Sequence, residues 1–178
     1  MIIVITGHRP KKLNNIYDIY HPMYVSIGRE MRDFILKQIT LLEDGEKLRL
    51  VTGMALGIDT VFALVALKLK EKFPDKIILH CAIPCAGQEE QWSKIDQERY
   101  DQILSKADEI VMVSREKYKG KKTMFDRDEY MVDMLAVERG YLLAVWNGIP
   151  NGGTYHTIEY AQGKSASIQT IDPNRHMQ

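Results

Sequence analysis

The stretch formed by residues 48–60 constrains the fold more than any other part of this sequence. Its apolar run, residues 48–51, is typical of a buried strand, and Thr52-Gly53 interrupts that run. Apolar residues then recur at helical spacing, at Ile58, Phe62, Val65 and Leu69. A strand, a glycine turn and a helix start bring backbone N–H groups to the positive end of a helix dipole. The stretch therefore predicts either an anion-binding loop or a tight turn without a ligand.

Strands alternate with helices along the rest of the chain. We expect strands at residues 1–6, 48–51, 76–83, 109–114, 141–146 and 167–171. We expect one helix capped by Ser26 and ending before Gly45, and further helices at 57–72, 88–107, 126–139 and 154–162, with Thr154 as a cap. This order predicts an α/β fold with a mainly parallel, doubly wound sheet. We expect one domain over residues 1–172 and a frayed tail at 173–178.

Charge and cysteine usage narrow the function classes. The chain has 24 basic and 24 acidic residues, so its formal net charge is zero, which disfavours nucleic-acid binding. The two cysteines, Cys81 and Cys85, have no second Cys/His pair nearby, so we expect no metal site. Neither a membrane-length apolar run nor a signal peptide is present, and we expect a cytoplasmic protein.

Every unusual loop in the sequence follows an expected strand. These loops are residues 7–10, 52–57, 84–92, 115–125 and 147–154. In doubly wound sheets, ligands bind beyond the carboxyl ends of the strands, where the strand order reverses. The loops should therefore gather at one edge of the sheet and form a site there.

Two of these loops carry residues suited to an anionic ligand. Arg9, after Gly7 and His8, offers a planar set of donors for phosphate or carboxylate, and His8 can donate or act as an acid or base near neutral pH. The second loop, residues 151–154, combines Gly152 and Gly153 with a hydroxyl at a helix start. Two such loops predict a ligand with several anionic groups, or with a phosphate and a ribose. The alternatives are a surface loop and a simple helix cap.

Three further residues have both a ligand-binding and a structural interpretation. Asp59 either caps a helix or contacts a ribose hydroxyl, and Trp92 either stacks on a base or packs in the core. Arg127 either reaches the ligand or belongs to a solvated helix face. The candidate ligand-binding residues are Gly7, His8, Arg9, Thr52, Gly53, Met54, Gly57, Asp59, Trp92, Arg127, Asn147, Gly152, Gly153 and Thr154.

Taken together, these motifs resemble the SLOG superfamily, a Rossmann-like group related to the LOG proteins and DprA, and especially its YpsA/YspA branch. The matching pieces are residues 6–10, 52–59, Pro84 with Gln91-Trp92, 107–108, 130–133, 144–148 and 152–154, in order along nearly the whole chain. The branch includes versions common in phages and mobile elements. The resemblance implies a Rossmann-like fold with helices on both faces, and a pocket for a nucleotide or nucleotide-derived ligand, such as an NAD-like, ADP-ribose-like or cyclic nucleotide signal. It also implies a homodimer or higher homo-oligomer.

The LOG enzymes hydrolyse an N-glycosidic bond with a glycine-rich run, P-G-G-x-G-T-x-x-E, whose Glu acts with an Arg. Matching Gly153-Thr154 to its G-T puts Thr157 at the Glu position, whereas matching Gly152-Gly153 to its G-G puts Glu159 there. We prefer the first alignment because it keeps Thr154 at the helix start. It leaves no catalytic carboxylate in the run.

The leading hypothesis is therefore a nucleotide-binding sensor or sequestering protein, and the sequence identifies no cofactor besides the expected nucleotide-type ligand. The second is a nucleotide N-glycoside hydrolase, with Glu159 or Asp59 as the candidate catalytic carboxylate. The third is DprA-like binding of single-stranded DNA, which needs a basic groove and rests on the lysine-rich loop with Lys117, Lys119, Lys121 and Lys122.

Overall fold

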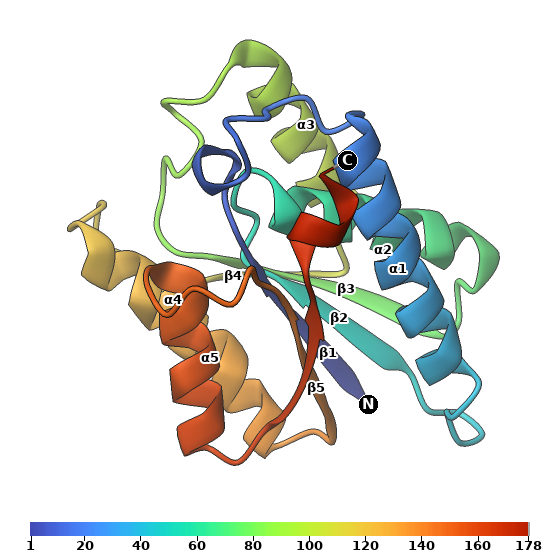
Figure 1. Ribbon diagram of the computed structural model, residues 1–178. Helices are drawn as coiled ribbons and strands as arrows, with labels where there is room; N and C mark the ends of the chain where they lie inside the picture. The colour runs from blue at the N-terminus through green and yellow to red at the C-terminus, as the bar shows by residue number, and fades with distance from the viewer. Residues whose placement is uncertain (178) are drawn as a thin grey trace.

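Six parallel strands form one sheet in the order β4-β3-β2-β1-β5-β6, in a computed structural model that describes residues 1–177 (Figure 1). The strands are β1 (Ile2–Gly7), β2 (Leu48–Thr52), β3 (Ile77–Ile83), β4 (Glu109–Met112), β5 (Gly140–Val145) and β6 (Ser167–Ile171). All five neighbouring pairs are parallel. The expected α/β, doubly wound fold is confirmed.

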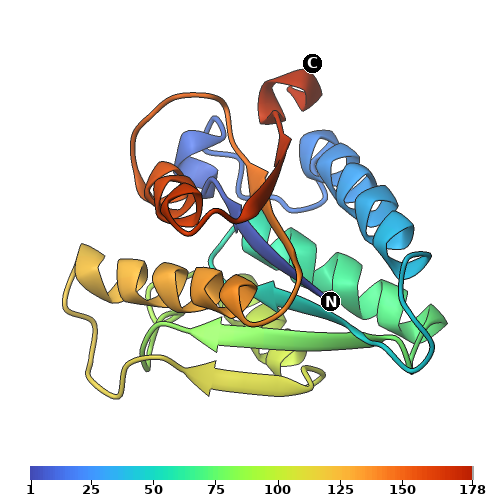
Figure 2. The same cartoon turned by 90° about the horizontal axis from the view of Figure 1, so that it is seen from below.

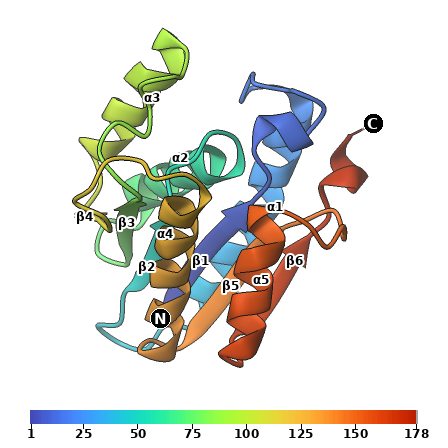
Figure 3. The same cartoon turned by 90° about the vertical axis from the view of Figure 1, so that its left-hand side faces the viewer.

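Five helices cover the two faces of the sheet. They are α1 (Pro22–Ile39), α2 (Ile58–Lys72), α3 (Lys94–Leu104), α4 (Lys121–Asp133) and α5 (Gly153–Gly163). Figures 2 and 3 show α1, α2 and α3 on one face and α4 and α5 on the other. Each face has its own apolar core, and the β1 residues Ile2–Ile5 are fully buried because both faces of that strand are covered. No helix in residues 1–177 is long and apolar enough to cross a membrane.

The order of the strands reverses between β1 and β5. These two strands pair from Ile2 with Gly140 to Gly7 with Val145, so their carboxyl ends lie side by side. The chain after β1 leads toward α1 on one face, and the chain after β5 leads into α5 on the other (Figure 1). The space between the diverging loops is where this class of fold holds its ligands.

Three helices have other bounds than the sequence predicts. The first helix begins at Pro22, because His21 is the cap: its Nδ1 accepts the Met23 N–H at 3.2 Å. The third begins only at Lys94, since the Ser93 hydroxyl accepts the Asp96 N–H. The fourth runs from Lys121 to Asp133, so part of the expected basic loop is helical.

The end of the chain also differs from the expected frayed tail. Pro173–His176 form a short 3-10 helix, η3, which packs against α1. The His176 ring lies between two α1 side chains, with Nδ1 at 2.8 Å from Ser26 Oγ and Nε2 at 3.0 Å from Glu30. Ser26, expected to cap α1, instead lies inside that helix and contacts the tail.

Candidate functional site

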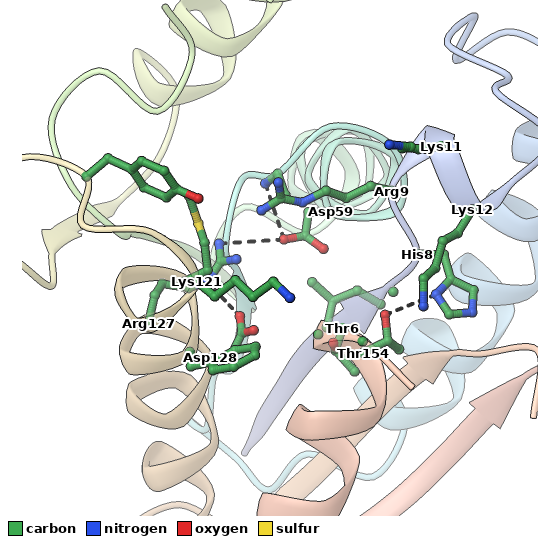
Figure 4. Close-up of a pocket in the computed structure, with 18 residues that line it drawn as sticks. Thr6, His8, Arg9, Lys11, Lys12, Asp59, Lys121, Arg127, Asp128 and Thr154 are labelled. Carbon is green, nitrogen blue, oxygen red and sulfur yellow. Dashed lines mark hydrogen bonds and ion pairs between the residues drawn. The ribbon is translucent and has the colours of Figure 1, made fainter. Parts of the chain in front are cut away.

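Four segments meet at the carboxyl edge of the sheet and enclose a cavity of about 330 Å³ (Figure 4). They are the end of β1 with the loop after it, the start of α2, the segment around the start of α4, and the start of α5. The lining residues are Ile5, Thr6, Gly7, His8, Arg9, Lys11, Lys12, Ala55, Asp59, Tyr118, Lys121, Met124, Phe125, Arg127, Asp128, Gly152, Gly153 and Thr154. The structure thus brings the turn before α2 and the turn before α5 to one shared hollow.

The cavity is rich in positive charge. Arg9, Lys11, Lys12 and Lys121 line it, and within residues 1–177 none of the four lies within 4.0 Å of a carboxylate. Arg9 and Lys121 extend over the cavity from opposite sides (Figure 4). The Lys12 ammonium donates to the backbone oxygen of Asn151 at 2.9 Å, which ties the β1 loop to the loop before α5. The arrangement suits an anion that reaches between the two sides.

His8 orients a hydroxyl in the wall of the cavity. The ring is 2% exposed, and its Nε2 accepts the Asn147 N–H at 3.4 Å. The ring hydrogen then lies on Nδ1, which is 3.2 Å from Thr154 Oγ1 and donates to it. Burial lowers the pKa of His8, which favours this neutral form. The Thr154 hydroxyl accepts from His8, and its own hydrogen is left to donate into the cavity.

The amino end of α5 faces the same space. Gly152 is the cap residue with a φ of 85°, and no side chain caps the first turn. Thr154 is the second residue of the helix, so it is not the cap that the sequence predicts. Gly153 has open space around it, because a Cβ there would meet nothing within 4 Å. The first-turn N–H groups and the helix dipole favour a negative group here.

Two N–H groups of the turn before α2 are bound by side chains of the same segment. The Ala55 N–H donates to the Asp59 carboxylate at 3.3 Å, and the Met54 N–H donates to Thr52 Oγ1 at 3.2 Å. Thr52, Gly53, Met54 and Gly57 do not line the cavity, which receives only Ala55 and Asp59 from this region. Asp59 therefore occupies the position at this turn where an anion would bind.

Arg127 holds a buried cluster at the back of the cavity. Its side chain is only 4% exposed, and its Nε donates to the Asp128 carboxylate at 2.7 Å. Its Nη1 donates to the carbonyl oxygen of Gly53 and lies 3.9 Å from the Asp59 carboxylate. Burial raises the pKa of Asp59, the positive charge of Arg127 lowers it and the Asp128 charge raises it, and the net result is a pKa of about 6. Asp59 and Asp128 are the carboxylates among the lining residues.

Other candidate residues lie outside the cavity. Trp92 packs edge-on against Tyr100 with ring centroids 5.5 Å apart, and Asn147 contributes its N–H to His8. Glu159 is exposed and does not line the cavity. Thr157, which takes the Glu position in the preferred alignment, is buried and donates to the Gly153 carbonyl oxygen at 2.9 Å.

The sequence reasoning missed several residues that line the cavity. From the β1 side these include Thr6, Lys11 and Lys12, and from the α4 side Tyr118, Lys121, Met124, Phe125 and Asp128. Lys11 and Lys12 directly follow Arg9-Pro10, and this run of basic residues could have identified them from the sequence.

The lysine-rich segment that supported the DNA-binding hypothesis is partly neutralised. Lys119 pairs with Glu116 and Lys122 pairs with Asp126, both at 2.6 Å, which reduces the positive charge available for a DNA groove. No cluster of three or more His, Cys, Asp or Glu side chains in the described part of the chain could hold a metal ion.

Comparisons with known proteins identify a family and relatives of this chain. The sequence profile of the YspA SLOG family matches residues 3–175. A UPF0398 protein of Bacillus cereus strain ATCC 14579 is 28% identical over 163 residues, which cover 92% of this chain and 83% of the relative. UPF0398 proteins of Bacillus cereus strain B4264 and Bacillus thuringiensis strain Al Hakam are 27% identical with the same coverage.

Proposed function

The chain belongs to the YspA SLOG family, and we propose that its cavity binds a nucleotide or nucleotide-derived ligand through the phosphate groups of that ligand. The observation that carries the proposal is the group of four cations, Arg9, Lys11, Lys12 and Lys121, around one hollow without carboxylate partners among residues 1–177. The four side chains are exposed to solvent, so they are free to form charge-assisted hydrogen bonds with a ligand that supplies negative charge. We infer a sensor or a sequestering protein.

The cavity offers two kinds of phosphate contact besides the cations. The Thr154 hydroxyl is fixed as a donor by His8, and the first-turn N–H groups of α5 lie beside it without a side-chain cap. Helix starts of this kind bind phosphate oxygens through both hydrogen bonds and the dipole. We place a phosphate group between this helix start and the Arg9 and Lys121 side chains.

The aromatic wall suits the base. Tyr118 and Phe125 line the α4 side, and Tyr118 is 57% exposed, so its ring is accessible for stacking. Phe125 already stacks on His156 with centroids 4.0 Å apart. The volume lies at the lower end of the range of about 300–1,000 Å³ for small-molecule sites, which fits one nucleotide better than two.

Isothermal titration calorimetry tests this proposal. The wild-type chain is titrated with AMP, NAD, ADP-ribose, cyclic ADP-ribose isomers and cyclic dinucleotides, with adenosine as the control that lacks phosphate. Saturable heat with a phosphorylated compound and none with adenosine is the expected result. Absence of heat with every phosphorylated compound would remove these compounds as ligands.

One observation favours hydrolysis as a second candidate function. Asp59 lines the cavity beside Asp128, and its pKa of about 6 would let it hold a proton near neutral pH, as a general acid requires. Chromatography of nucleoside monophosphates and NAD after incubation tests this activity. Base release by the wild type that is lost in Asp59→Asn supports hydrolysis, whereas unchanged substrates rule against it. From the family membership we also propose that the chain forms a homodimer or higher homo-oligomer, and sedimentation velocity tests this.

A further inference from the structure

A second hollow lies between α1 and α2, away from the nucleotide cavity. It has a volume of about 360 Å³, and α1 and α2 run side by side along it (Figure 1). We call it the α1–α2 groove. Its lining residues are Ile19, Tyr20, Tyr24, Val25, Gly28, Arg29, Arg32, Val61, Leu64, Val65, Lys68, Leu69 and Lys72. None of them lines the nucleotide cavity.

The groove is bounded by regular stripes of the two helices. On α2 the stripe runs from Val61 to Lys72, a distance of about 16 Å at the rise of an α-helix. On α1 the stripe includes Gly28, where a Cβ would come within 3.3 Å of Val61 Cγ1, so the helices approach closely at that point. Tyr20 and Val25 are 73% and 39% exposed, so apolar surface remains uncovered along the groove. The length of the α2 stripe matches about three turns of a bound helix.

The charge around this apolar floor has one sign. Arg29, Arg32, Lys68 and Lys72 line the groove, and no Asp or Glu is among its lining residues. Arg32 pairs with Asp33 at 2.8 Å, whereas Arg29, Lys68 and Lys72 have no carboxylate within 4.0 Å in residues 1–177. A bound segment with a row of apolar side chains would pack against the apolar residues of the groove. Acidic side chains on both sides of that row would pair with the basic residues along the edges of the groove.

We propose that the α1–α2 groove binds an acidic amphipathic helix of another protein. Apolar side chains at helical spacing would fill the groove, as in other helix-in-groove complexes. Asp and Glu side chains flanking that ridge would face Arg29, Lys68 and Lys72. The surface would connect the chain to a partner independently of the nucleotide cavity.

Selection from a phage-displayed library tests the groove directly. The library holds 14-residue peptides with apolar residues fixed at helical spacing and all flanking positions randomised, and the full chain is the bait. We expect enrichment of Asp and Glu at the flanks. A selected peptide, once synthesised, should bind the wild type at least tenfold more tightly than it binds the Lys68→Glu or Val65→Asp variant. Its affinity for the wild type should fall as the salt concentration rises. The matched control is Lys37→Glu, because Lys37 is an exposed α1 residue outside the groove.

Several outcomes would overturn the proposal. They are no enrichment, enrichment of basic flanks, and equal affinity for the wild type and Lys68→Glu. Lys68 is exposed, so this variant keeps the test valid even if Val65→Asp does not fold. A self-association that Val65→Asp and Lys68→Glu abolish in sedimentation velocity would assign the groove to a second copy of the chain and would also overturn it.

Discussion

The guanidinium of Arg127 occupies the space that a side chain at Gly53 would need. A Cβ placed on Gly53 would lie 1.8 Å from Arg127 Nη1, and the same nitrogen donates to the Gly53 carbonyl oxygen. The contact joins the turn after β2 to α4, 74 residues later in the chain. Glycine at this position therefore makes room for a buried cation, which in turn lies against Asp59 and Asp128 at the back of the cavity.

This contact predicts that Gly53→Ala is destabilising. The added methyl group must displace a buried side chain that is held by three partners, and overpacking of this kind costs about 1–3 kcal/mol. Urea unfolding of both proteins measures the change. The matched control is Gly163→Ala at the end of α5, where a Cβ meets nothing within 4 Å. We expect the control to be neutral or stabilised by up to about 1 kcal/mol, and equal losses in both variants would contradict the explanation.

The raised pKa of Asp59 predicts a pH-dependent stability. The folded chain holds this proton more tightly than the unfolded chain, so ionisation of Asp59 opposes folding as pH rises from about 4 to about 6. The unfolding free energy of the wild type relative to Asp59→Asn should fall by about 3 kcal/mol across this window and stay level above it. The contribution of His8 is present in both proteins, so it largely cancels when their unfolding free energies are subtracted. Denaturant unfolding at several pH values measures this difference in free energy, and a difference that does not change with pH would refute the raised pKa of Asp59.

The hydrogen bonds of His8 predict its tautomer. Because Nε2 accepts the Asn147 N–H, the neutral ring should carry its hydrogen on Nδ1, and burial should hold its pKa below the ordinary value. Nitrogen-15 NMR of the imidazole rings reports both properties. A protonated Nε2 at neutral pH, or a midpoint at or above 6.5, would contradict the arrangement in which His8 orients the Thr154 hydroxyl.

The sequence predicted the sheet well because its strands carry a strong and simple signal. The Ile2–Ile5 run is apolar throughout, as a strand covered on both faces must be, and each of the first five strands is followed by a loop with unusual residues. Helix bounds were less predictable, since the His21 cap depends on the side-chain position of a residue that is not among the usual caps. Polar residues at 88–93 looked helical beside Trp92 and Ile95, but the helix starts only after Ser93.

The candidate site was predictable in location and less so in composition. That Gly7, His8, Arg9 and the Gly152–Thr154 turn share one cavity follows from parallel strands ending at one edge. Local spacing could not reveal that Asp59 satisfies the turn before α2, because that depends on how its carboxylate is directed. It also could not reveal that Lys121 and Phe125 face the cavity, since the segment carrying them becomes helical only from Lys121 onward.

The most direct test of the central claim uses a probe with phosphates but no base or ribose. Two-dimensional 1H–15N NMR of the wild type is recorded during a titration with pyrophosphate, alongside the Arg9→Gln/Lys121→Gln double variant and the Lys37→Gln control. We predict saturable shifts of the Gly153 and Thr154 amide signals in the wild type and the control, and at least a tenfold weaker response in the double variant. Unmoved signals from the start of α5, or equal responses in all three proteins, would contradict a phosphate-binding cavity at this edge of the sheet.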